Sequence, residues 1–249
     1  MVDSPSKRFI WLDCDPVHGN TSLANTEMNA AKCLEAFGAP ENIKVYRGAP
    51  KPLIRPVRHD PQIHGISGLA GVENLPDASD PKVLRRFQHP EGQMKAIEAI
   101  ANAVRRTWRN GEGQQVVILS SGPMTNIALF VSVYPELLAG VEEFVFMGGG
   151  VGVGNRSAAA EFNILCDPEA AQIVLDAPVK KTMIPLNATH TAIVSRSVHG
   201  QLLSPSKSAL TTGDTTDLEL PPASTPLRLV SNLGPPLHDV TDRRICFCT

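Results

Sequence analysis

The middle of the chain alternates short apolar runs with segments of helical spacing. Residues 115–119 and 144–147 are predicted buried strands, and residues 181–185 are a further predicted strand. Helices are predicted from the SSGPMTN turn to residue 133 and over residues 168–175, the latter with Asp167 as N-cap and Pro168 in the first turn. Strands that alternate with helices indicate a parallel sheet. The predicted fold class is therefore α/β, a single domain with a mostly parallel sheet flanked by helices.

The N-terminal half continues this pattern less regularly. Residues 9–14 and 43–46 are predicted strands, and residues 25–37 and 93–109 are predicted helices, the first of which ends at Gly38. Residues 47–90 are rich in Pro, Gly and His and are predicted to form a long loop or lid. The domain is expected to span residues 8–240, with a loop or disordered stretch at 204–226 and an aberrant tail at 241–249.

Charge and cysteine content narrow the possible partners and the compartment. The 249 residues carry 23 Lys and Arg against 25 Asp and Glu, so there is no general attraction to nucleic acid or anionic membranes. No apolar run is long enough to cross a bilayer. Five cysteines without CxxC spacing favour reduced thiols in a cytoplasmic protein. The alternative is a metal site at Cys246 and Cys248, for which no partner residues are evident.

Polar motifs follow the predicted strands, where a parallel sheet binds its ligands. Asp13 and Asp15 are two positions apart, so they lie on one face of a strand and suit a hard cation such as Ca²⁺. The alternative is a solvated strand end. The glycine-rich run at 148–155 suggests a dinucleotide site, but no register of it fits G-x-G-x-x-G and no helix opens directly after it, which disfavours that interpretation.

The motifs are more specific in combination than alone. DCDP, HGN, IHGISGL, SSGPMTNIA, FVFMGGGVGVGN, AEFNILCDPEAA and PPLHD follow one another in this order along most of the chain. In this combination the sequence resembles the inosine-uridine-preferring nucleoside hydrolases, and the stretch from residue 116 to 175 is the most specific part. The resemblance implies hydrolysis of the N-glycosidic bond of ribonucleosides to ribose and free base, with one Ca²⁺ as cofactor. Both purine and pyrimidine nucleosides are possible substrates, and homo-oligomers are usual.

The resemblance also implies roles for individual residues. Asp15, the Ser121 carbonyl and Asp239 would bind Ca²⁺, with Asp13 behind them. His238 would lie beside the nucleobase and assist its departure. The ribonucleoside itself would be held by residues from four motifs: Asn20, His64, Met147, Asn155, Glu161 and Asn163. Taken alone, Glu161 could instead be a surface charge and Asn163 a turn-forming residue.

One part of the family pattern is missing. Cleavage of an N-glycosidic bond develops positive charge on the ribose, and a carboxylate must take a proton from the attacking water. In the family this base comes from paired aspartates in D-P-x-x-D-D, followed by a helix and a strand before HGN. Here a single residue, Val17, separates Pro16 from His18. Since a parallel crossover needs about a dozen residues or more, one whole α-β step is expected to be lost.

Two functions from different classes therefore remain possible. The first is a nucleoside hydrolase, impaired because the general base is absent. The second is a non-catalytic isoform or gene-model fragment that binds ribosides, or a full-length subunit, without turnover. The gene or transcript sequence between the codons for Pro16 and Val17 would distinguish these two functions. An untranslated in-frame segment there that encodes paired aspartates would make this chain an artefact or isoform of an active enzyme.

Overall fold

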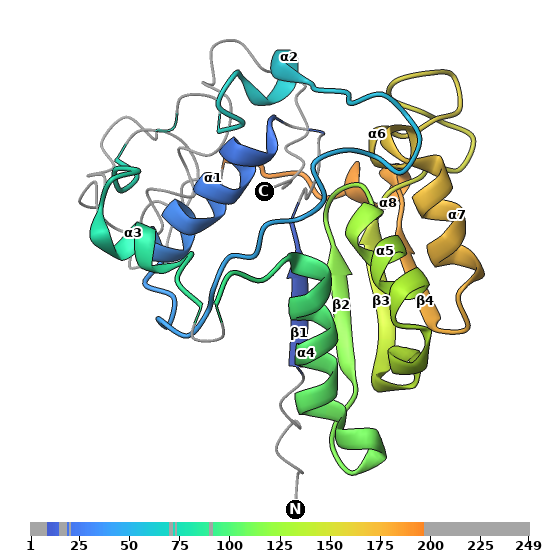
Figure 1. Cartoon of the computed structure of the whole chain (residues 1–249). Coiled ribbons are helices and arrows are strands. Elements are labelled where there is room, and N and C mark those ends of the chain that lie inside the picture. The colour runs from blue at the N-terminus through green and yellow to red at the C-terminus, as the bar shows by residue number, and fades with distance from the viewer. Residues whose placement is uncertain are drawn as a thin grey trace, which may run out of the picture.

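A four-stranded parallel sheet organises the molecule. The structure is a computed structural model that describes residues 9–14, 19, 21–69, 72, 74–89 and 92–196. The strands lie in the order of the chain: β1 (Phe9–Asp13), β2 (Val116–Ser120), β3 (Val141–Met147) and β4 (Lys180–Ile184). Each pairs in parallel with the next, as Figure 1 shows. The predicted α/β fold with a parallel sheet is confirmed.

Three helices cover one face of this sheet and form the core with it (Figure 1). They are α4 (Ala96–Trp108), α5 (Thr125–Val133) and α7 (Pro168–Asp176). Side chains alternate between the faces of a strand, so Ile118, Phe144 and Phe146 point toward these helices and are fully or almost fully buried. They pack with Ile100, Val104, Ile127, Phe130 and Val174 from the helices.

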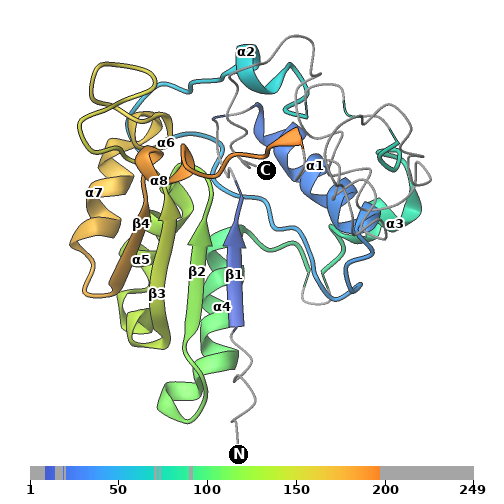
Figure 2. The ribbon, with the colours of Figure 1, turned by 180° about the vertical axis from the view of Figure 1, so that it is seen from behind.

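The opposite face of the sheet carries no helix within the part of the chain that the structure describes (Figure 2). Leu12 and Leu119 are paired in register on this face and are 52% and 36% exposed. Ile10 on β1 is 64% exposed. Parallel sheets are normally covered on both faces, so this apolar surface is unusual.

The described helices between β1 and α4 lie beside the sheet rather than on it (Figures 1 and 2). Here α1 (Leu23–Ala36) packs against α3 (Pro81–Arg85), and the short α2 (Pro61–His64) lies nearer the carboxyl ends of the strands. Ser22 caps α1 by accepting from the Asn25 amide at 3.3 Å. After α1 the chain turns at Gly38, whose φ of 65° suits glycine. The predicted helix end at Gly38 is confirmed.

The predicted strand at residues 43–46 is wrong. The Ile43 amide donates to the Pro40 carbonyl and the Val45 amide to the Arg86 carbonyl, and Tyr46 stacks on His89 with ring centroids 4.3 Å apart. The almost fully buried guanidinium of Arg86 donates to the Ile43 carbonyl at the start of the segment and to the Ala39 and Pro40 carbonyls just before it. These bonds help to hold the start of the segment as a loop.

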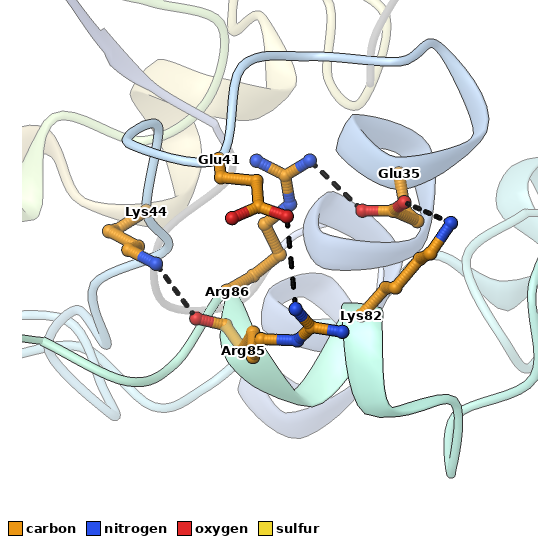
Figure 3. Close-up of a pocket in the computed structure, with 6 residues that line it drawn as sticks. All are labelled: Glu35, Glu41, Lys44, Lys82, Arg85 and Arg86. Atoms are coloured by element: carbon orange, nitrogen blue, oxygen red, sulfur yellow. Dashed lines mark hydrogen bonds and ion pairs between the residues drawn. The ribbon is translucent and has the colours of Figure 1, made fainter.

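Arg86 belongs to a charged cluster that lines a small pocket between α1 and α3 (Figure 3). Its guanidinium also pairs with Glu35 at 3.0 Å, and Lys82 and Arg85 reach toward Glu35 and Glu41. The ion pairs shown in Figure 3 hold these side chains to one another. The cluster therefore ties the loop after α1 to α3 and lies away from the carboxyl ends of the strands.

The remaining elements are short. Two 3₁₀ turns, η1 (Arg109–Gly111) and η2 (Pro135–Gly140), precede β2 and β3. The helices α6 (Phe162–Cys166) and α8 (Leu186–Thr189) were not predicted, because each is about one turn long and leaves no periodic signal. The predicted cap is confirmed: Asp167 accepts from the Ala170 amide at 3.1 Å, and Pro168 occupies the first turn of α7. Among the described helices, none is long and apolar enough to cross a membrane.

Candidate active site at the carboxyl edge of the sheet

The polar motifs meet where the parallel strands end. Asp13 is paired in register with Ser120, and the Ser121 amide donates to the Asp13 carbonyl at 3.1 Å. Met147 ends β3 at the same edge, beside Ile184 of β4. The prediction that Asp13, Ser121 and Met147 lie at one edge of the sheet is confirmed. Motifs that are more than a hundred positions apart in the sequence are thereby brought into contact.

Asp13 is buried below this edge and is held by α5. Its Oδ1 accepts from the Asn126 side chain at 3.0 Å, and Oδ1 of Asn126 accepts from the Ala49 amide at 2.8 Å. Only 4% of Asp13 is exposed. The carboxylate therefore supports the edge from within, which fits a residue behind the metal ligands.

Glu161 organises the backbone around the site. Its Oε1 accepts from the Asn163 amide at 2.9 Å, and its Oε2 accepts from the amides of Gly149 and Ile164 at 3.0 and 3.1 Å. The side chain thus caps α6 and holds the glycine-rich loop to it. With 2% of the residue exposed, the interpretation of Glu161 as a surface charge is wrong.

Asn163 joins the ends of β2 and β3. Its Nδ2 lies 3.3 Å from the Ser121 carbonyl, 3.1 Å from the Met147 carbonyl and 3.3 Å from the Met147 sulfur. The Ser121 carbonyl is the backbone oxygen expected to bind Ca²⁺. The Asn163 amide therefore lies directly beside that candidate ligand, and Met147 is its neighbour.

Two loops approach this edge from different sides. His64 ends α2, and burial lowers its pKa from the ordinary value. Asn155 lies exposed in the glycine-rich loop, with its amide donating to the Ala160 carbonyl at 3.1 Å. An ion pair between Asp60 and Arg156 joins the two loops. Sequence reasoning named His64 and Asn155 but missed this pair, since no local pattern connects positions so far apart.

Four predicted site residues lie outside the described residues: Asp15, Asn20, His238 and Asp239. Within the described residues, no three His, Cys, Asp or Glu side chains gather as metal ligands. What these residues do contribute is oxygen: the Ser121 carbonyl at the edge and the Asp13 carboxylate behind it. An oxygen donor set is the chemistry that Ca²⁺ prefers. The described residues alone therefore offer two oxygen-bearing groups near this edge, and the predicted ligands Asp15 and Asp239 lie outside them.

Asp167 extends the same network toward the outer loops, and sequence reasoning gave it only the role of a helix cap. It is fully buried, and its Oδ2 accepts from the Thr125 hydroxyl at 2.6 Å and from the Leu53 amide at 3.0 Å. The carboxylate therefore ties α5, α7 and the loop after residue 47 together just behind the site. The Asp-Pro pair at 167–168 predicted the helix cap. The contacts of Asp167 with Thr125 and Leu53 were not predictable, because these residues are far away in the sequence.

Comparisons with known proteins agree with this geometry. The family profile described as inosine-uridine preferring nucleoside hydrolase matches residues 10–241. The chain is 36% identical over 207 residues to a pyrimidine-specific ribonucleoside hydrolase of Salmonella paratyphi A, covering 74% of this chain and 61% of that protein. It is 34% identical over 225 residues to the uridine nucleosidase of Saccharomyces cerevisiae, covering 78% and 62%.

Solved structures give the same result. A purine-preferring ribonucleoside hydrolase from Gardnerella vaginalis superposes with a TM-score of 0.63 at 26% identity, covering 79% of this chain and 66% of that one. An inosine-guanosine nucleoside hydrolase superposes with a TM-score of 0.69 and covers 91% and 73%, and at 21% identity it supports the fold alone.

The match is incomplete in a characteristic way. The chain spans only 55–62% of the length of the curated relatives named here or similar to them. The alignment with the yeast protein is 225 positions long, but it covers only 78% of the 249 residues of this chain. The alignment is therefore longer than the number of residues that this chain contributes, so some residues of the yeast protein are aligned with gaps in this chain. Because the profile matches nearly the whole chain and relatives exceed 30% identity, the chain belongs to the inosine-uridine preferring nucleoside hydrolase family.

Proposed function

We propose that the carboxyl edge of the sheet is the remnant of a ribonucleoside N-ribohydrolase site, and that this chain has lost most of its activity. The observation that carries the proposal is the position of Asn163. Its amide lies between the ends of β2 and β3, beside the Ser121 carbonyl, and Glu161 holds the backbone beneath it. Family membership supplies the reaction class, hydrolysis of an N-glycosidic bond.

The chain's own residues would divide the work of binding. Asn20, Asn155, Glu161 and Asn163 would hold the ribose, with Met147 against it and His64 closing over it. His238 would lie on the side of the departing base and help it leave. Support comes from the fixed backbone: Glu161 accepts three amides, so the loop that carries the ribose-binding residues is held in one conformation.

Ca²⁺ is the proposed cofactor, bound by Asp15, the Ser121 carbonyl and Asp239, with Asp13 behind them. When bound, such an ion anchors ribose hydroxyls and lowers the pKa of a water molecule. The buried Asp13 would contribute by holding the strand end through its bond to Asn126. Three protein ligands are few for Ca²⁺, which takes 6–8 oxygens, so we propose weak binding.

Loss of activity follows from the missing aspartate pair. A general base typically contributes about 100- to 10,000-fold to a rate, and no other carboxylate is proposed to replace it. We propose that one α-β step is missing between Pro16 and Val17, in a domain spanning residues 8–240. The gaps in the match to the yeast relative support a lost internal segment. A non-catalytic isoform, or gene-model fragment, that binds ribosides or a full-length subunit is the second candidate, favoured by the same loss.

Release of ribose from inosine and uridine tests the proposal, with and without added Ca²⁺. The 249-residue chain is compared with a version in which the corresponding segment of a homologous hydrolase, with its paired aspartates, is inserted after Pro16. We expect negligible turnover by the chain as it stands and clear, Ca²⁺-dependent turnover by the restored version. Robust turnover by the unmodified chain would contradict the proposed loss of the base.

Two properties of the protein extend this proposal. A cytoplasmic location is proposed from the sequence, whose five cysteines show no CxxC spacing. Assembly into homo-oligomers is proposed from the family alone, and sedimentation of the purified chain would measure it.

A further inference from the structure

Asp60 occupies a helix-capping position without acting as a cap. It precedes α2, where an aspartate side chain normally accepts from an amide of the first turn, yet its carboxylate makes no such bond. The side chain turns instead to the glycine-rich loop and pairs with the guanidinium of Arg156. Since only 7% of Asp60 is exposed, this carboxylate is removed from water and needs a cationic partner.

Arg156 is held on two further sides. Its Nη1 donates to the Asn155 carbonyl at 3.0 Å, and its guanidinium carbon lies 5.4 Å from the centre of the Phe162 ring. Its side chain is 30% exposed, so the pair is partly shielded from solvent. The guanidinium therefore presents a fixed, partly desolvated charge to Asp60, rather than the loose end of a surface side chain.

The other contacts of the His64 loop (residues 57–69) lead in a different direction. The Thr21 hydroxyl donates to the Ile66 carbonyl at 2.7 Å, and the Asn29 side chain donates to the Ser67 carbonyl at 2.7 Å. Both contacts tie the loop to α1 and the residues just before it. Among the described residues, the Asp60–Arg156 pair is the one polar link between this loop and the glycine-rich loop (residues 148–160).

We propose that Asp60 and Arg156 form a latch that positions the His64 loop against the glycine-rich loop. His64 lies four positions after Asp60, and Asn155 lies one position before Arg156. The latch therefore fixes the distance between His64 and Asn155. The part that concerns substrate rests on the proposed function, because those two residues are candidates for holding the ribonucleoside. The latch itself exists without any ligand and is measured without one.

Hydrogen exchange of the full 249-residue chain, followed by mass spectrometry, tests the latch. The variants are Asp60→Asn, Arg156→Met and the charge swap Asp60→Arg with Arg156→Asp. Asp77→Asn is the matched control, since Asp77 lies in an exposed turn and its side chain hydrogen-bonds only to Ser79 among the described residues. We expect each single variant to speed exchange in the His64 loop roughly 5- to 30-fold, with β2 and β3 unchanged.

The charge swap separates a specific pair from general damage. It restores opposite charges across the two loops, so exchange should return toward the unmodified rate. The proposal is overturned if the single variants behave like Asp77→Asn, if the swap recovers nothing, or if β2 and β3 lose protection equally. Failure of the proposed function is a separate result: it shows as absence of turnover in the restored chain, whatever the exchange rates are.

The effect of the latch on the reaction is measured by steady-state kinetics in the chain with the segment restored after Pro16. Asp60→Asn should raise KM with little change in kcat, because loop closure contributes to substrate binding rather than to proton transfer. A large fall in kcat at unchanged KM would contradict a positioning role.

Discussion

At the scale of single residues, Glu161 is the side chain on which the shape of the candidate site depends most. It accepts from three backbone amides and is 2% exposed. Glu161→Gln replaces one accepting oxygen by an NH₂ group that faces N–H donors. We expect a loss of about 1–3 kcal/mol in the free energy of unfolding, measured by urea denaturation.

Glu41→Gln is the control for that substitution. Glu41 is 83% exposed at its side chain and lies 3.8 Å from Arg85, so the same chemical change should leave the free energy of unfolding within about 0.5 kcal/mol. Equal effects of the two substitutions would show that Glu161 is not the buried organiser that its contacts indicate.

We expect two histidines to make the free energy of unfolding depend on pH. Burial lowers the pKa of His64 from the model-compound value of 6.5, and burial followed by the charge of Lys44 lowers the pKa of His89. The unfolded chain therefore binds protons at a pH where the folded chain does not. This contribution to stability is fully present above pH 6.5 and is lost as the pH falls through the folded-state values.

We expect the free energy of unfolding to fall between pH 7 and pH 5, and His64→Gln and His89→Gln each to make that fall shallower. Urea denaturation at a series of pH values measures the slope. If the double variant retained the full slope, other groups would be responsible for it.

Which residue contacts were predictable depends on sequence separation. The Asp167 cap was read from the sequence because its partner lies three positions away. The bond between Asp13 and Asn126 spans 113 positions, and nothing in either local pattern specifies it. Resemblance placed Asn163 and Glu161 in the site, whereas their bonding partners emerged only from the fold.

At the scale of elements, apolar runs predicted the strands and caps predicted the helix ends, because both signals are local. At the exception, residues 43–46, the buried Arg86 about forty positions later binds the Ile43 carbonyl and two carbonyls just before the segment. A short apolar run does not show that a distant side chain will bind its carbonyls. The helices α6 and α8 were missed for another reason, because they are too short to show a helical period of apolar residues.

The two faces of the sheet should differ in their contribution to stability. Ile118 is fully buried under the helices, so Ile118→Ala should cost about 2–5 kcal/mol. Leu12 is 52% exposed on the opposite face, so Leu12→Ala should cost less than about 1 kcal/mol. Urea denaturation compares them. A cost for Leu12→Ala as large as that for Ile118→Ala would mean that further residues cover this face.

At the scale of the whole molecule, the proposed loss of one α-β step concerns both the fold and the site at β1. Among the described strands, β1 lies at an edge of the sheet and pairs with β2 alone. The proposed missing step would follow β1 directly and would carry the paired aspartates at its start. Loss of that one proposed segment would leave β1 at the edge of the sheet and would remove the proposed general base as well.

Binding of Ca²⁺ should therefore distinguish this chain from one with the segment restored. A ligand at 100 times its Kd stabilises a protein by about 2.7 kcal/mol, which for a domain of this size raises Tm by roughly 5–11 °C. We expect that rise for the restored chain in Ca²⁺, and less than about 1 °C for the 249-residue chain at the same concentration. Differential scanning calorimetry measures both, with Mg²⁺ as the control, because Mg²⁺ requires a tighter octahedral site. An equal rise for the two chains would show that the aspartates present here already complete the metal site.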